Sequence, residues 1–243
     1  MRYGVLSDIH SNVDALASVL RELDGLGMDT LVCLGDIVGY GPSPNETCDL
    51  LRERGCIAIA GNHDEAAAAG SEAESFNALA RKAIVWTRAQ LSASNREYLR
   101  SLPREYRFDS FAIVHGAPAF HFDYIQNVAD AQVAFERVVA PVTFIGHTHV
   151  AEVYYQDARG RTYHQKLSSG GRIEIAPQYR YIINPGSVGQ PRDRNPQASF
   201  ASFDDALKLV EVRRVTYDVM RVRERMQLAD LPAQLGERLA IGY

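Results

Sequence analysis

Five short segments of the sequence carry residues that can bind metal ions. They combine aspartate, asparagine and histidine, and five of the seven histidines in the chain fall within them. In chain order the segments are Asp8-Ile9-His10, Gly35-Asp36, Gly61-Asn62-His63-Asp64, His115 and Gly146-His147-Thr148-His149. Imidazole and carboxylate ligands without a thiolate suit manganese, iron, zinc or cobalt rather than a closed structural zinc site.

The number of candidate ligands predicts two bound ions rather than one. Seven candidates exceed the needs of a single ion, and a carboxylate can bridge two ions. Two divalent ions about 3.5–4 Å apart are the arrangement that hydrolyses phosphoesters, because together they hold the attacking and the leaving oxygens. The residue types and their number therefore indicate phosphoester hydrolysis at a binuclear centre.

The candidate ligands follow strand-like sequence, which predicts that they meet at one edge of a sheet. The first third of the chain alternates short apolar runs with helical patterns, a signature of parallel strands joined by crossover helices. We predict strands at 3–7, 30–34 and 56–60, a helix from the N-cap Asn12 to about Gly25 and Gly27, and a helix from the N-cap Ser43 to Gly55.

The pattern changes from helices to short strands farther along the chain. Residues 64–102 have a helical pattern with a capping box at Ser94-x-x-Glu97 before Pro103. Beyond them we predict a hairpin of 106–108 and 111–114, a helix at 130–139, a buried strand at 142–145, short strands between Val150 and Val215, and helices after Tyr217. A length of 243 residues without a break in composition predicts one compact domain over 1–243.

Together, these motifs resemble the signature of the calcineurin-like metallophosphoesterase superfamily. That signature is Asp-x-His, Gly-Asp, Gly-Asn-His-Asp/Glu, a lone His and Gly-His-x-His, and every part is present here in order. The match runs from Asp8 to His149, about three-fifths of the chain, and five ordered motifs are far more specific than any one alone. The resemblance implies an α/β fold, a four-layer α/β/β/α sandwich of two mixed sheets flanked by helices.

The resemblance also implies a role for each candidate residue. One ion would be bound by Asp8, His10, Asp36 and His149, and the other by Asp36, Asn62, His115 and His147. Asp36 would then be the bridging carboxylate. His63 would lie over the ions, where it stabilises developing charge or protonates the leaving oxygen, and Asp64 would orient it. The implied nucleophile is a hydroxide shared by the two ions, which attacks in line without a covalent enzyme intermediate.

Two further segments are candidates for substrate binding. Gly39-Tyr40-Gly41-Pro42 follows Asp36, and a glycine-rich segment over 184–192 follows a predicted strand. We take Tyr40 and Arg192 from these segments, and Arg194 just beyond the second, as candidate substrate-binding residues, because a guanidinium binds phosphate bidentately. The alternative is that both segments are structural turns with solvated arginines.

The motif details favour a phosphodiesterase. Protein phosphatases and dinucleoside tetraphosphatases of the superfamily follow Gly-Asp with x-x-Asp-Arg-Gly and carry Gly-Asn-His-Glu, whereas this chain has no arginine near Asp36 and has Asp64 in place of glutamate. The chain looks like the small bacterial phosphodiesterase branch, acting on a small, nucleotide-like substrate. The alternatives are a phosphomonoesterase or a dinucleoside or nucleotide polyphosphate hydrolase that uses Arg192 or Arg194. More remote is a non-catalytic scaffold, like the retromer subunit, which has lost the histidine equivalent to His63.

Composition narrows the partners and the compartment. The net charge of −4 argues against a nucleic-acid-binding protein, and no apolar stretch is long enough to cross a membrane. Three cysteines in a chain of this length are expected to be reduced, which favours the cytoplasm. We expect two divalent ions, with manganese favoured over iron, zinc, cobalt or nickel, and a small phosphoester as the substrate. The segment from Tyr217 to Ile241 could also pack against a second copy in a homo-oligomer.

Overall fold

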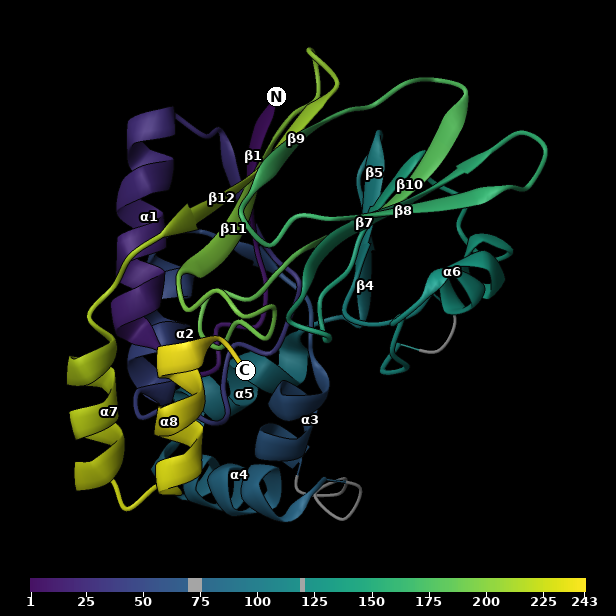
Figure 1. Ribbon diagram of the computed structural model, residues 1–243. Helices are drawn as coiled ribbons and strands as arrows, with labels where there is room; N and C mark the ends of the chain where they lie inside the picture. Colours follow the sequence, from purple (N-terminus) through teal and green to yellow (C-terminus); the bar gives the residue numbers. More distant parts are fainter. Residues whose placement is uncertain (70–75, 119–120) are drawn as a thin grey trace.

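The computed structural model describes residues 1–69, 76–118 and 121–243, which form two β-sheets with helices on their outer faces (Figure 1). The strands are β1 (Arg2–Leu6), β2 (Thr30–Cys33), β3 (Ile57–Ala58), β4 (Glu105–Arg107), β5 (Phe111–Val114), β6 (Val142–Phe144), β7 (Ala151–Asp157), β8 (Thr162–Lys166), β9 (Gly171–Glu174), β10 (Tyr179–Pro185), β11 (Ala198–Asp204) and β12 (Leu209–Val215). The helices are α1 (Val13–Leu26), α2 (Pro44–Glu53), α3 (Asn62–Ala69), α4 (Ala78–Gln90), α5 (Ala93–Ser101), α6 (Val128–Phe135), α7 (Val219–Leu228) and α8 (Ala233–Ile241).

Both sheets are mixed. Sheet A has the strand order β3-β2-β1-β11-β12-β9, in which β1, β2 and β3 are parallel and the later strands are antiparallel. Sheet B has the order β4-β5-β6-β10-β7-β8, with β5, β6 and β10 parallel at its centre. The predicted parallel strands joined by helices are confirmed for β1 to β3, and the predicted hairpin is the antiparallel pair β4 and β5.

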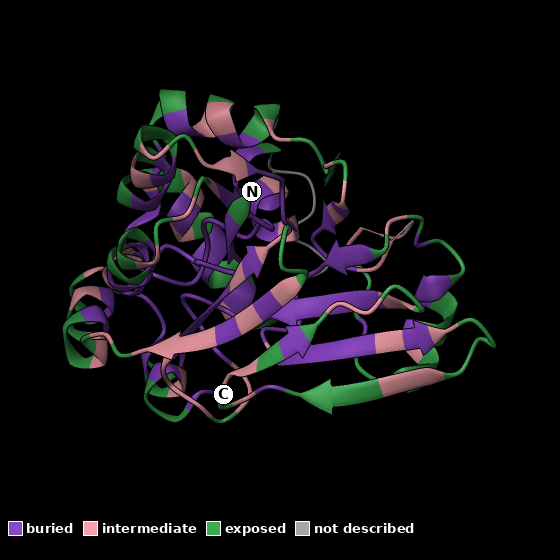
Figure 2. Ribbon diagram, turned by 90° about the horizontal axis from the view of Figure 1, so that it is seen from above, coloured by how far each residue is buried: buried purple, intermediate pink, exposed green. Residues whose placement is uncertain are grey.

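The two sheets pack face to face through a buried apolar layer. Phe111 and Phe144 of sheet B contact Phe203 of sheet A, with ring centroids 5.5 and 5.8 Å away from that of Phe203. Burial of each ring contributes about 1.5–3 kcal/mol. Helices α1 and α2 cover the outer face of sheet A and α6 covers part of sheet B, so buried residues gather in the strands and on the inner helix faces (Figures 1 and 2). The predicted α/β/β/α sandwich is confirmed.

The C-terminal helices that we predicted after Tyr217 are α7 and α8. They pack against each other and against α4, where Met226, Leu235 and Ala80 are buried in one apolar cluster. Tyr40 belongs to the same cluster. The last helices of the chain therefore support a residue that follows the second metal-binding motif.

Residues 64–102 are not one continuous helix. The chain forms α3, α4 and α5 in this region, and 70–75 lie outside the described residues. The predicted capping box at Ser94 is wrong, because α5 starts two residues earlier with Ser92 as N-cap, whose Oγ accepts from Asn95 N at 3.1 Å. Ser43 is the N-cap of α2 as predicted, but its side chain makes no capping hydrogen bond.

The loops that carry the metal-binding motifs lie together at one end of the sandwich. They follow β1, β2 and β3 of sheet A and β5 and β6 of sheet B, at the lower end of the sheets in Figure 1, beside α3. The sheets thus bring residues from distant parts of the chain to one place. Within the described ranges, no helix is both long and apolar enough to span a membrane. The three cysteines form no disulfide.

Candidate metal centre

The candidate ligands from both sheets converge on one buried site. Two groups of side chains have ligand atoms that all lie within 4.8 Å of one another. The first group is Asp8, His10, Asp36 and His149, and the second is Asp36, His115 and His147. Asn62 lines the same cavity as Asp36 and His147. The structure therefore brings all seven candidates together, with Asp36 shared by both groups.

Five of these residues have a left-handed backbone conformation that residues other than glycine rarely adopt. The angle φ is +52° at Asp8, +47° at His10, +52° at Asp36, +69° at His147 and +61° at His149. Each such residue costs about 1–3 kcal/mol, and aspartate and histidine are among the residues that tolerate the region. A concentration of these conformations at one point indicates a backbone shaped to turn the side chains inward.

The ring orientation of three of the histidines is set by a backbone carbonyl. A carbonyl oxygen only accepts, so the histidine Nδ1 must carry the proton in each pair. The pairs are His10 with Val38 O at 3.1 Å, His115 with Leu34 O at 2.8 Å and His149 with Gln190 O at 2.7 Å. In the neutral ring, Nε2 is then left with a free lone pair. This is the arrangement that metal-binding histidines use.

The contacts inside the cluster fit divalent cations. His10 Nε2 and His149 Nε2 lie 3.0 Å apart, although both neutral rings present a lone pair there. Two lone pairs at this distance repel each other unless a cation binds both. At the second group, His147 Nε2 and the neighbouring Asn62 Oδ1 are buried without a hydrogen-bond partner. Buried polar atoms are rarely left in that state, and metal coordination would satisfy both of them.

Asp8 is held by loops from both sheets. Ser7 Oγ donates to Asp8 Oδ2 at 2.6 Å, and His147 N lies 3.2 Å from each carboxylate oxygen. Burial raises the pKa of Asp8 to about 6. A bound cation would favour the ionised carboxylate and offset this cost of burial.

Asp36 and His115 form the main charged pair of the site. Burial would raise the pKa of Asp36, but the imidazoles of His115 and His63 hold it well below its usual range. Burial would lower the pKa of His115, but Asp36, 3.3 Å away, raises it to about 9. A protonated His115 therefore balances the charge of Asp36 when no cation does. Because ligand histidines are neutral, ion binding must release this proton.

His63 lies at the start of α3, directly beside the shared carboxylate. Its backbone N–H donates to Asp36 Oδ1 at 2.9 Å, and its ring is packed between Tyr40 and Phe76, with centroids 4.5 and 4.7 Å away. Burial, with the nearby charge of Arg192, lowers the pKa of His63 to about 4. The ring is therefore neutral near pH 7, which favours hydrogen bonding to a phosphoryl oxygen over proton donation from an imidazolium.

The predicted orientation of His63 by Asp64 is corrected by the structure. Asp64 Oδ1 accepts from Val38 N at 3.1 Å and Oδ2 accepts from Gly61 N at 2.9 Å. The carboxylate thus ties the Asp36 loop to the start of α3, while aromatic contacts hold the His63 ring. The physical reason is that Asp64 lies in the first turn of α3, where free backbone N–H groups attract a carboxylate.

The glycine-rich loop after β10 supports the site from outside. Ser187 Oγ and Gly189 N both donate to the backbone oxygen of Asp8, at 2.7 and 3.0 Å. Arg192 N donates to the backbone oxygen of His149 at 3.1 Å. The motif was visible in the sequence as a candidate substrate loop. These backbone contacts with two candidate ligands are a supporting role that the sequence did not reveal.

A buried ion pair anchors this loop to sheet A. The side chains of Asp193 and Arg214 are 1% and 4% exposed and form an ion pair. Asp193 Oδ2 also accepts from Ala151 N at 3.2 Å, at the start of β7. Removal of only one partner of a pair buried to this degree strongly destabilises the fold, because it leaves the other charge buried and unpaired. The loop that carries Arg192 is therefore fixed on both sides.

Two of the three candidate substrate-binding residues face the site. Tyr40 and Arg192 line its cavity, with the Arg192 guanidinium 5.7 Å from the centre of the Tyr40 ring. Arg192 Nη2 donates to Gln190 Oε1 at 2.8 Å, whereas Nε is buried without a partner. Arg194 is exposed and is not among the described lining residues; its backbone N–H donates to Gly242 O.

A cavity of about 380 Å³ opens above the candidate ligands. Besides residues already predicted, it is lined by four that the sequence analysis missed, namely Phe76, Asn77, Phe122 and Tyr124. Tyr124 stacks on His147, with centroids 3.9 Å apart and planes at 18°. No spacing rule links these residues to the motifs, because only the folded chain brings them to the site.

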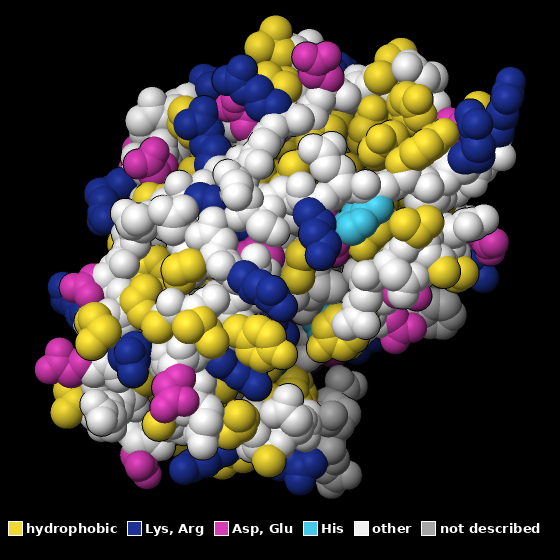
Figure 3. Space-filling model, in the orientation of Figure 1, with side chains coloured by type: hydrophobic (Ala, Val, Ile, Leu, Met, Phe, Trp, Pro, Cys, Tyr) yellow, Lys and Arg dark blue, Asp and Glu magenta, His cyan; other side chains and the backbone are white. Residues whose placement is uncertain are grey.

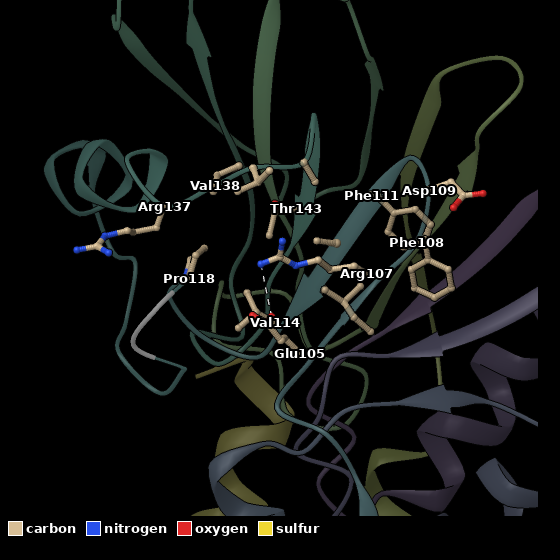
Figure 4. A pocket seen from close by; sticks show the side chains of 14 residues that line it. Glu105, Arg107, Phe108, Asp109, Phe111, Val114, Pro118, Arg137, Val138 and Thr143 are labelled. Carbon is tan, nitrogen blue, oxygen red and sulfur yellow. Dashed lines mark hydrogen bonds and ion pairs between the residues drawn. The ribbon is translucent and has the colours of Figure 1, made fainter.

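A second cavity, of about 420 Å³, lies on the outer face of sheet B (Figure 4). Arg107 of β4, Arg137 beyond α6 and Thr143 of β6 are among the residues that line it. None of the described residues that line it is a histidine, and none is a candidate ligand. The chemistry of the protein is therefore assigned to the smaller cavity above the histidines.

The fold and this site define a metallophosphoesterase class, and comparison with known proteins agrees. Residues 1–206 match the model of the calcineurin-like phosphoesterase superfamily domain, and the chain belongs to this family. A crystal structure of a metallophosphoesterase from Sphaerobacter thermophilus is 38% identical, with a TM-score of 0.87 over 100% of this chain and 99% of that one.

Other relatives extend across the whole chain. An uncharacterized protein of Methanocaldococcus jannaschii is 34% identical over 249 residues, which cover 98% of this chain and 97% of that protein. A hypothetical protein from Pyrococcus horikoshii, 22% identical, has the same fold, with a TM-score of 0.80 over 100% of this chain and 98% of that one. The family assignment therefore does not depend on the motif region alone.

Proposed function

We propose that the protein is a metal-dependent phosphodiesterase that acts on a small phosphodiester. The observation that carries this proposal is the carboxylate of Asp36, which is shared by two groups of buried ligand atoms. A shared carboxylate between two groups is what a binuclear hydrolytic centre needs. Manganese is our favoured metal, because the donors are imidazole, carboxylate and amide without thiolate. The free cysteines favour a cytoplasmic location for the protein.

The ions, His63 and Arg192 would each have a separate role in the reaction. The ions would supply Lewis acidity and a nucleophile derived from water near neutral pH. Neutral His63 would donate a hydrogen bond to an oxygen of the phosphoryl group or of the leaving alcohol. Arg192, whose Nε is buried without a partner, would bind a non-bridging oxygen.

The charge of the cavity supports a diester over a monoester. Arg192 is the one arginine or lysine among the described residues that line it. Ile37 and Val38, which follow Asp36, are apolar and fully buried, so they add no charge to the cavity. Apart from the charge that the ions themselves would supply, a single guanidinium matches the single negative charge of a diester better than the two charges of a monoester. On the face shown in Figure 3, positive and negative side chains are interspersed, which fits a small substrate better than a nucleic acid.

Turnover of two chromogenic substrates tests the proposal. Protein stripped with chelator and resupplied with manganese should hydrolyse bis-p-nitrophenyl phosphate faster than p-nitrophenyl phosphate, and the stripped protein should hydrolyse neither. Preference for the monoester would replace the proposal with a phosphomonoesterase. Absence of turnover with two ions bound would favour the scaffold interpretation, which intact His63 currently opposes.

Two matched arginine variants test the phosphate contact. Arg192→Ala should raise the KM for the diester roughly ten-fold, since it removes a charge-assisted contact. Arg194→Ala, an exposed arginine in the same loop, should leave KM unchanged. An unaltered KM in Arg192→Ala would remove that residue from the binding site.

His63→Ala should lower kcat about 100-fold with two ions still bound per chain.

A further inference from the structure

The wall of the cavity beyond the candidate ligands is aromatic. Of the eleven described residues that line it, four carry an aromatic ring other than imidazole, namely Tyr40, Phe76, Phe122 and Tyr124. None of the eleven is aliphatic, and Asp36 is the one carboxylate among them. A lipid-like diester would need aliphatic contacts. A sugar diester would need hydrogen-bonding groups beyond the amides of Asn62 and Asn77.

Tyr124 presents an open aromatic face. One side of its ring is covered by His147 at 3.9 Å, in a nearly parallel stack. The residue is nevertheless 48% exposed, whereas the candidate ligands Asp36, His147 and His149 in the same cavity are buried. A ring that only held His147 in place would not need this exposure. An open aromatic face beside a phosphate-binding centre is a surface on which a planar group can stack.

Phe76 and Phe122 extend this surface from two other points. Phe76, which precedes α4, meets the His63 ring edge-on at 4.7 Å, and Phe122 meets the His115 ring edge-on at 6.2 Å. Each of these two side chains thus has a fixed partner at the metal centre and also lines the cavity. Rings held in this way lose little freedom when a ligand binds, which favours affinity.

We propose that Tyr124, in a cavity that Phe122 and Phe76 also line, binds a nucleobase carried by the phosphodiester substrate. The proposal rests on the proposed phosphodiesterase function and adds the class of substrate, a nucleotide-containing diester. Tyr124 is the stacking face. Arg192 and the bound ions would hold the phosphate in the same cavity, whose volume of about 380 Å³ is within the size range of small-ligand sites.

Binding of two ligands that differ only in the base tests the proposal without turnover. With manganese-loaded protein, calorimetry should give adenosine 5′-monophosphate a Kd about ten-fold or more below that of ribose 5-phosphate. Tyr124→Leu should remove this ratio, and Tyr124→Phe, which keeps the ring, should retain it. Tyr106→Leu, at an exposed tyrosine of β4 that does not line the cavity, should leave the ratio unchanged.

Turnover provides the second measurement and separates the two proposals. The p-nitrophenyl ester of thymidine 5′-monophosphate should be hydrolysed with a kcat/KM at least ten-fold above that of methyl p-nitrophenyl phosphate, which has the same leaving group. Equal values for both pairs of ligands would overturn the nucleobase site and leave the phosphodiesterase standing. Failure to bind ribose 5-phosphate and to hydrolyse either diester would overturn both proposals.

Discussion

Gly39 makes room for the ring of His63. Its φ is +96°, and a Cβ atom added there would overlap His63 Nδ1. We predict that Gly39→Ala lowers kcat about 10- to 100-fold, because a shift of an ångström or less in a catalytic group is costly. Steady-state kinetics with a count of bound metal would measure this, and the metal content should not change.

Gly160→Ala is the matched control for this prediction. Gly160 also has a positive φ, of +77°, but a Cβ atom there would meet nothing within 4 Å. It should therefore show only the backbone cost of about 1–2 kcal/mol in stability, with normal kcat. Equal loss of kcat in both variants would mean that Gly39 acts through the backbone and not through His63.

At the level of single residues, the motifs predicted which candidate ligands come together but not how the chain holds them. Asp8, Asp36 and His149 were predicted because their types and order are specific. Their left-handed backbone could not be predicted, since each residue by itself favours other conformations. The contacts of Tyr124 and the partners of Asp64 also depend on tertiary proximity, for which the sequence has no local signal.

Strand β9 is an edge strand that charged side chains tie to β12. Glu211 of β12 pairs with Arg172 of β9 and accepts from Arg213 Nη2 at 2.8 Å. The hydrogen bond from Arg213, followed by that from Arg172, lowers the pKa of Glu211. Because the pKa of Glu211 is lowered in the folded state, its contribution to stability is present above the pKa of glutamate in the unfolded state, about 4.3. This contribution is lost as the pH falls through the pKa of Glu211 in the folded state.

Glu211→Gln should therefore destabilise the protein at pH 7 and have a smaller effect as the pH falls below about 4. Both arginines are exposed by more than a third, so we expect less than about 1 kcal/mol. Calorimetric Tm values of the variant and the native protein at pH 7 and pH 3.5 would measure this. Glu97→Gln, at a 76% exposed side chain, is the control. A Tm difference between the variant and the native protein that grows on acidification would contradict the proposed pairing of Glu211 with the two arginines.

Among the elements, those with strong local signals were predicted best. Asn12 caps α1 through a hydrogen bond to Ala15 N, and Gly27 ends this helix with a φ of +66°, as their residue types indicate. The break between α3 and α4 was missed because alanine-rich sequence favours helix on both sides of it, whereas the start of α5 was predicted two residues too late. Ser92 and Ser94 are both good caps, and the contacts of α5 with α2 and α3 decide between them.

The metal centre joins the two sheets, so its occupancy should affect the stability of the whole molecule. Asp8, His10 and Asp36 come from sheet A, whereas His115 and His147 come from sheet B. An ion that binds only the folded state stabilises it by about 2.7 kcal/mol at 100 times its Kd. For a chain of this length we expect manganese to raise the Tm of chelator-stripped protein by about 5–10 °C.

Scanning calorimetry with and without manganese would measure this change. Asp36→Asn, which weakens the shared ligand, should lose most of the increase, while Asp109→Asn, an acidic residue outside the site, should keep it. An unchanged Tm with two ions bound per chain would show that the ions bind the unfolded chain as tightly as the folded one, which would contradict a site built by the fold.

For the molecule as a whole, the layers were predicted through the family resemblance, but the strand order was not. Nothing local to β1 predicts that its neighbour is β11, a strand almost 200 residues later in the chain. The same holds for Tyr40, whose supporting helices α7 and α8 lie at the other end of the sequence. Such long-range pairs are decided by which apolar faces fit together in the finished fold.

That order of strands determines when the centre can exist during protein synthesis. Every candidate ligand is made by residue 149, yet Asp8 follows β1, a strand that pairs with β11, Ala198–Asp204, as well as with β2. The backbone oxygen of Asp8 is also held by Ser187 and Gly189. A nascent chain on the ribosome thus contains all the ligands well before it has the frame to hold them. We therefore expect stable metal binding only after the last third of the chain has been translated.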